Sequence, residues 1–213
     1  MPPVTFPDVS GCAMTGSPTG KRIVVKVGTA VVSRADGKLA LGRLGGLVEQ
    51  LCELADAGHQ VLLVSSGAVG LGAARLGIPR PTDLRDRQAA AATGQIQLAH
   101  AYQEILALEK IRVAQILLTP GDTEERRRYL NARSTIATLL SLGALPVVNE
   151  NDTVATSEIR YGDNDRLAAR VAQMISADCL VLLSDVDGLY TADPKEDANA
   201  KFIREVKDLD NEI

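Results

Sequence analysis

A chain of 213 residues with 46% apolar residues, 3% aromatic residues and no Trp can bury a sizeable aliphatic core. Its net charge of -4 argues against a nucleic-acid-binding surface, and its three Cys residues lack the Cys-x-x-Cys spacing of a zinc site or the even number of a disulfide framework. No apolar run approaches the roughly 20 residues that cross a bilayer. These features favour a cytoplasmic protein without a membrane partner.

The predicted elements alternate between apolar, β-branched runs and segments with helical spacing. After a flexible extension over residues 1–20, strands are expected at 22–32, 60–65, 112–119, 145–148 and 179–183. Helices are expected at 39–57, before Gly77, at 84–109 with an interruption at Gly94, at 131–142 and at 164–176, and a surface hairpin is expected near 158–163. This alternation is typical of βαβ units around a mainly parallel sheet, the α/β class.

Polar clusters directly follow four of these strands. They are Lys26–Thr29, Ser65–Ala68, Asn149–Asp152 and Ser184–Asp185. In an open α/β sheet, ligands bind in the crevice beyond the carboxyl ends of the strands. The pattern therefore predicts one site built from four loops.

Lys26, two residues before Gly28, is a candidate phosphate ligand. A lysine at a strand end supplies a mobile point charge, and a glycine lets backbone N–H groups approach phosphate oxygens closely. A surface lysine beside a turn glycine explains the same triplet, because Lys-x-Gly alone is a weak motif.

Ser65-Ser66-Gly67-Ala68 opens a glycine-rich helix start. Its N–H groups and the helix dipole favour an anion. The glycines at 67, 70 and 72 do not form the dinucleotide fingerprint G-x-G-x-x-G, and a tight strand-to-helix turn is an equally good interpretation.

Asn149-Glu150-Asn151-Asp152 offers amide donors and carboxylate acceptors together. That combination suits an amino-acid ligand, whose carboxylate and ammonium groups have a fixed separation. The alternative interpretation is a solvated loop after a buried strand.

Gly162-Asp163-Asn164-Asp165 precedes a predicted helix, and an N-cap accounts for one of its polar residues. A carboxylate near a lysine orients the ammonium group, which makes a positioning role attractive for Asp165. The spacing of a calcium loop does not follow.

The loop Ser184–Gly188 follows the last buried strand. Loops rich in Asp and Gly can hold a ribose or a hydrated Mg²⁺ ion. A β-turn at Asp187-Gly188 is the alternative interpretation.

With these residues assembled, the chain resembles the amino acid kinase family, and in particular its glutamate-specific branch. The resemblance runs from about Lys21 to the end of the chain. Lys-x-Gly and Ser-Ser-Gly occur across the family. The segment Asn-Glu-Asn-Asp-Thr-Val-Ala-Thr at 149–156, together with Gly-Asp-Asn-Asp at 162–165, is much more particular to that branch.

The resemblance implies a three-layer αβα sandwich and ATP-dependent phosphorylation of the side-chain carboxylate of L-glutamate, with Mg²⁺. The product would be γ-glutamyl phosphate, the entry to proline biosynthesis. It also implies a homo-oligomer inhibited by proline. Carried over by position, catalytic roles fall to Lys26 and Asp165, glutamate binding to Ser66, Asp152 and Asn164, and ATP binding to Lys26, Gly28, Ser184 and Asp185, with no protein ligand to a metal.

The chemistry agrees with these roles. Phosphoryl transfer needs two anions brought into line and their charge neutralised, with little covalent work by the protein. The attacking carboxylate is already ionised at neutral pH, so no general base is required.

One departure concerns the end of the chain. The family carries a later Gly-Thr-Gly-Gly-Met-x-Thr-Lys segment whose lysine also serves ATP, and this sequence stops at Ile213 before it. We therefore expect a kinase domain over 21–213 that is incomplete at its C-terminus, with little turnover from these residues alone.

Two other functions are compatible with the same residues. One is a kinase for another small acid in the same fold. The other is a non-catalytic regulatory module that binds an amino acid. A nicotinamide-dependent oxidoreductase fits least, because the dinucleotide fingerprint is missing.

Overall fold

The computed structural model describes residues 20–154 and 164–206. These residues fall into two compact units, divided between Leu183 and Ser184. The extension predicted at 1–20 lies outside the described residues except for Gly20, and the hairpin predicted near 158–163 lies wholly outside them, so both stay predictions. Of the Gly162–Asp165 cluster, Asn164 and Asp165 are described.

The first unit is built on a sheet whose described strands are all parallel, in the order β3-β4-β2-β1-β5. Their bounds are Arg22–Val27 for β1, Gln60–Ser65 for β2, Arg112–Leu118 for β3, Ala144–Glu150 for β4 and Cys179–Leu183 for β5. Nearly continuous apolar runs form these strands, as expected for a sheet that is covered on both faces.

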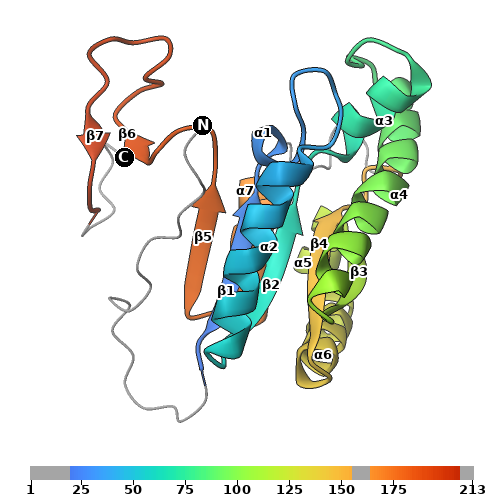
Figure 1. Ribbon diagram of the computed structural model, residues 1–213, viewed down its shortest axis with the longest axis vertical. Helices are drawn as coiled ribbons and strands as arrows, with labels where there is room; N and C mark the ends of the chain where they lie inside the picture. The colour runs from blue at the N-terminus through green and yellow to red at the C-terminus, as the bar shows by residue number, and fades with distance from the viewer. Residues whose placement is uncertain (1–19, 155–163, 207–213) are drawn as a thin grey trace. The chain divides into compact units, whose positions relative to one another are not determined.

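Helices cover both faces of this sheet (Figure 1). They are α1 (Thr29–Val32), α2 (Leu41–Asp56), α3 (Ala68–Leu76), α4 (Leu84–Leu108), α5 (Pro120–Glu124), α6 (Arg126–Ser141) and α7 (Asn164–Met174). On one face, α2, α3 and α4 pack against Val25 and Leu63. On the other, α6 and α7 pack against Val24 and Leu62. The predicted three-layer αβα sandwich is confirmed.

The connections create a crevice between β2 and β4. These strands are paired neighbours, with Val64 beside Val148. After β2 the chain enters α3 on one face of the sheet, and the next described helix after β4 is α7 on the opposite face. Neighbouring strands whose chains leave toward opposite faces form a topological switch point, where α/β folds bind ligands.

Two predicted strand ends were wrong. The first strand was expected to reach residue 32, but it ends at Val27, and Thr29–Val32 forms the short helix α1. The amides of Val31 and Val32 both donate to the carbonyl of Gly28, at 3.0 and 3.3 Å, so a local helical turn replaces the strand that the β propensity of this run predicts. In the other direction, β4 extends to Glu150 instead of ending at residue 148.

The interruption predicted at Gly94 was also wrong, because α4 runs through it without a break. Gly94 instead marks a close helix contact. A Cβ atom there would lie 1.8 Å from the carbonyl oxygen of Ala68, and a Cβ atom at Gly72 would lie 1.7 Å from that of Ala90. The backbones of α3 and α4 therefore touch, which only glycine at these two positions allows.

Tyr102 connects α4 to the end of β2. Its side chain is fully buried, and its hydroxyl lies 2.9 Å from Ser65 Oγ. Burial raises the pKa of Tyr102 to about 12, although the hydrogen bond to Ser65 opposes this shift. The folded protein therefore holds this phenol neutral in a pH range where an unfolded chain ionises it.

We expect Tyr102→Phe to flatten the alkaline loss of stability. An unfolded tyrosine ionises near pH 10, so wild-type stability falls as pH rises from 10 toward the folded pKa of about 12. At pH 11 this linkage amounts to about 1.3 kcal/mol. Urea unfolding of both proteins at pH 9 and pH 11 measures the difference in slope, and parallel slopes would contradict the assignment.

The second unit contains a small antiparallel pair, β6 (Leu189–Tyr190) and β7 (Phe202–Ile203). The rings of Tyr190 and Phe202 meet edge to face with centroids 5.4 Å apart. A Cβ atom at Gly188 would lie 2.3 Å from the Phe202 ring.

Throughout the described residues, we find no helix with the length and apolar character of a membrane span.

Candidate active site

A cleft of about 890 Å³ lies in the first unit, at the carboxyl ends of the strands. Ser66, Asn149, Asp152 and Asn164 line it. Its walls also include the start of α3 and several arginines, which are Arg34, Arg43, Arg80 and Arg87. The predicted glutamate-binding residues thus share one cavity at the β2–β4 crevice.

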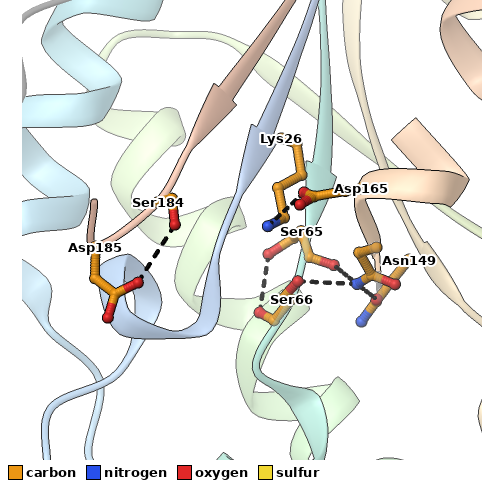
Figure 2. Close-up of polar contacts among 8 residues, drawn as sticks. Lys26, Ser65, Ser66, Asn149, Asp165, Ser184 and Asp185 are labelled. Atoms are coloured by element: carbon orange, nitrogen blue, oxygen red, sulfur yellow. Dashed lines mark hydrogen bonds and ion pairs between the residues drawn. The ribbon is translucent and has the colours of Figure 1, made fainter. Parts of the chain in front are cut away.

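Lys26 and Asp165 form an ion pair beside this crevice. The Nζ atom of Lys26 lies 2.6 Å from Oδ1 of Asp165, and Figure 2 shows the two side chains pointing toward each other. Lys26 is the last residue but one of the buried strand β1 and is only 7% exposed, while Asp165 lies in the first turn of α7. A buried cation needs such a partner, because desolvation without one is costly.

Asn164 joins three parts of the chain through its side-chain amide. Its Nδ2 atom donates to the carbonyl oxygen of Ser65 at 2.7 Å, to Ser66 Oγ at 3.0 Å and to Asn149 Oδ1 at 3.0 Å. Since Ser66 accepts this bond, its own hydroxyl hydrogen points elsewhere and can donate to a ligand. The pair Asn164-Asp165 therefore ties α7 to both the Ser66 loop and Lys26.

The turn after Ser66 exposes the start of α3 to the cleft. Gly67 has φ of 105°, a left-handed conformation that favours glycine, and Gly67, Ala68, Val69 and Gly70 line the cavity. The first N–H groups of a helix have no partner within the helix. They supply donors for an anion at this wall of the cleft.

Asn149 lies in the strand itself, not in a solvated loop, and is 2% exposed. Its Nδ2 atom donates to Gln95 Oε1 at 2.7 Å, and its Oδ1 atom accepts from the backbone N–H of Glu150 at 2.9 Å. Sequence reasoning missed Gln95. The sequence signal for it is spacing: Gln95 falls on the same face of the predicted helix as Ala91, Leu98 and Tyr102, which are all buried. A polar residue among buried ones needs a hydrogen-bond partner.

Besides Lys26, the residues predicted to bind ATP are Gly28 in the first unit and Ser184 and Asp185 in the second unit. The Gly28 amide donates to the carbonyl of Leu183 at 3.0 Å, which joins the ends of β1 and β5. Ser184 Oγ lies 3.3 Å from Asp185 Oδ1 (Figure 2). Lys195 donates to Asp185, and this hydrogen bond lowers the pKa of Asp185 and raises that of Lys195. Sequence reasoning missed Lys195, and the ATP roles stay predictions.

Comparison with known proteins places this geometry in a family. The model of the amino acid kinase family matches residues 21–212. The chain belongs to the amino acid kinase family. This membership agrees with the parallel sheet and with the cleft at the carboxyl ends of its strands.

Curated relatives within the amino acid kinase family extend well beyond this chain. "Glutamate 5-kinase" of Paramagnetospirillum magneticum is 59% identical over 194 residues, which are 91% of this chain and 52% of the relative. "Glutamate 5-kinase" of Bradyrhizobium diazoefficiens is 57% identical over 195 residues, with the same two shares. The chain spans about half the length of the curated relatives it matches.

A solved structure supports the amino acid kinase fold. UMP kinase from Bacillus anthracis superposes with a TM-score of 0.58 at 19% identity, covering 86% of this chain and 73% of that one.

Among the residues that the structure describes, no group of three or more His, Cys, Asp and Glu side chains could hold a metal ion.

Proposed function

We propose that this chain carries the acceptor site of an ATP-dependent kinase that phosphorylates the side-chain carboxylate of L-glutamate. One observation carries the proposal: consecutive residues Asn164 and Asp165 hold the Ser66 hydroxyl and the Lys26 ammonium at the same crevice. A donor for a carboxylate and a cation for a phosphoryl group are the two elements that this reaction needs side by side. The printed names of the relatives support the choice of glutamate.

In the proposed reaction, a γ-carboxylate oxygen attacks the γ-phosphorus of ATP. A new O–P bond forms, the bond to the β,γ-bridging oxygen breaks, and ADP leaves with that electron pair. Lys26 neutralises charge on the transferred group, and its burial strengthens this interaction by lowering the local dielectric. Asp165 keeps the ammonium in place, 2.6 Å away. The attacking group is an ionised carboxylate, so no residue needs to remove a proton.

Acceptor binding falls to Ser66, Asp152 and Asn164 in this proposal. The Ser66 hydroxyl and the first N–H groups of α3 donate to a carboxylate of glutamate. The Asp152 carboxylate, on the cleft wall, pairs with the substrate ammonium. A homo-oligomer, feedback inhibition by proline and a place at the entry to proline biosynthesis stay predictions from the family resemblance.

Substitution of Asp152 by Asn tests the substrate assignment. Losing one charged hydrogen bond to the substrate ammonium is expected to raise KM for glutamate by about 10- to 100-fold, with KM for ATP changed by less than about 2-fold. Asn164→Ala should show the same selectivity. Steady-state kinetics on the intact protein measures both constants, and Asp56→Asn, at the exposed end of α2, is the matched control.

The same assay separates the alternatives. Unchanged glutamate saturation in both variants would refute the assignment of these residues. Turnover with another small acid in an acceptor panel, but not with glutamate, would indicate a different kinase of the same fold. Stabilisation by glutamate without ADP formation, in a protein of the relatives' full length, would indicate a regulatory module instead.

A further inference from the structure

Gln95 connects the middle of α4 to the acceptor side of the cleft. Its Oε1 atom accepts a hydrogen bond from Asn149 Nδ2 at 2.7 Å, across 54 residues of sequence. Gln95 does not line the cleft, whereas Asn149 does. We therefore expect Gln95 to affect a ligand through Asn149.

The hydrogen bonds of Asn149 fix which way its amide faces. Nδ2 faces the Gln95 acceptor, and Oδ1 faces two donors, the Glu150 N–H and Asn164 Nδ2. Reversing the amide would turn its NH₂ group toward those two donors and its oxygen toward the Gln95 oxygen. The backbone N–H of Glu150 can only donate, so it requires Oδ1 on its side, and the Gln95 acceptor reinforces this orientation, in which Asn149 accepts from Asn164.

The orientation of the Asn149 amide affects Ser66 through Asn164. Asn164 Nδ2 donates to Asn149 Oδ1 and to Ser66 Oγ, both at 3.0 Å, and to the Ser65 carbonyl oxygen at 2.7 Å, so its NH₂ group faces Ser66 and makes Ser66 an acceptor from the protein. The Ser66 hydroxyl hydrogen is then available to a ligand carboxylate. Four side chains, Gln95, Asn149, Asn164 and Ser66, form one directed hydrogen-bond chain that ends at the cleft.

The backbone around Gln95 is held in place independently of this chain. Its neighbour Gly94 touches the α3 backbone at Ala68, and Tyr102, two turns along α4, bonds Ser65. Gln95 therefore presents its acceptor from a position fixed at both ends. A chain of amides anchored in this way is suited to holding a donor ready before the ligand arrives.

We propose that Gln95 is a positioning residue for acceptor binding, which acts through Asn149 and Asn164 to keep the Ser66 hydroxyl as a donor to the substrate carboxylate. The inference rests on the proposed glutamate kinase function. It adds a residue that lies outside the cleft and makes no contact with the substrate.

Gln95→Met keeps the length of the side chain and removes the acceptor. The variant is expected to raise KM for glutamate by about 10-fold, because Asn149 Nδ2 loses its partner in a buried position, while KM for ATP changes by less than about 2-fold. Gln95→Glu keeps an acceptor oxygen at the same reach and is expected to stay within about 3-fold of wild type. Gln97→Met, two residues along the same helix, is the matched control and should equal wild type.

A double variant distinguishes positioning from general loss of structure. In a Ser66→Ala background, Gln95→Met is expected to add less than about 2-fold to KM for glutamate, because the hydroxyl on which it acts is gone. Equal effects of Gln95→Met with and without Ser66 would overturn the inference, as would a Gln95→Glu protein as impaired as Gln95→Met. A wild-type protein that does not use glutamate would refute the proposed function itself and this inference with it.

Discussion

Lys26→Met is expected to lower kcat for phosphoryl transfer by about 10²- to 10³-fold, while KM for glutamate changes little. The reason is that the Lys26 ammonium is needed most in the transition state, where charge on the transferred phosphoryl group is greatest. Methionine keeps the length of the side chain and removes only the charge. Steady-state kinetics on the intact protein, with saturating ATP and glutamate, gives kcat directly.

Two further variants serve as a control and as an intermediate case for this result. Lys110→Met removes an exposed lysine just before β3, at the opposite end of the sheet, and should leave kcat unchanged. Asp165→Asn leaves the Lys26 charge but weakens the 2.6 Å ion pair that holds it, and a smaller loss of about 10-fold is expected. A Lys26→Met protein with near wild-type kcat would remove the central element of the proposed mechanism.

Gly94→Ala is expected to be strongly destabilising, by about 3 to 5 kcal/mol of unfolding free energy. The added methyl group would lie 1.8 Å from the Ala68 carbonyl oxygen, and the obstacle is helix backbone, not a side chain that can rotate away. The two helices would have to separate. Urea unfolding followed by far-UV circular dichroism measures the loss, and Gly72→Ala should behave in the same way.

The chain provides a matched control for this substitution. Gly46 lies inside α2, and a Cβ atom there would have no neighbour within 4 Å. Gly46→Ala is therefore expected to stabilise the protein by about 0.5 to 1 kcal/mol, because alanine loses less backbone freedom on folding than glycine. If the two alanine variants had similar stabilities, the α3–α4 contact would not be as close as the structure shows.

Local patterns predicted most of the fold and the position of the cleft. Apolar runs located all five strands of the sheet, and the polar residues after them brought Ser66, Asn149 and Asp152 to one cavity. This works because the carboxyl ends of parallel strands lie at one edge of a sheet, so order along the chain determines proximity in space.

Long-range contacts could not be read from the sequence in the same way. Asn149 appeared as part of a polar loop, but it pairs with Leu117 in the β3–β4 ladder, and its buried amide donates to Gln95 on a helix 54 residues away. Thr29–Val32 was wrong for a local reason: β-branched residues favour a strand, but the amides of Val31 and Val32 turn back to the Gly28 carbonyl three and four residues earlier and form a helical turn. The interruption assigned to Gly94 is wrong because this glycine serves a long-range contact, the close approach of α4 to the α3 backbone at Ala68.

The boundary between Leu183 and Ser184 was also not predicted. No run of Pro, Gly or Ser marks it, because the second unit begins directly where β5 ends. The interaction of Lys195 with Asp185 connects residues ten positions apart inside that unit, and no sequence motif predicts it.

Because Gly94, Gln95 and Tyr102 share one helix, the length of α4 between them cannot vary. A single-residue insertion or deletion there would rotate everything beyond it by roughly 100° and shift it by about 1.5 Å, so these contacts could not all form together. The segment 77–83, between α3 and α4, carries no such constraint from these contacts. When related sequences are aligned with this one, gaps therefore belong before Leu84 and not between Gly94 and Tyr102.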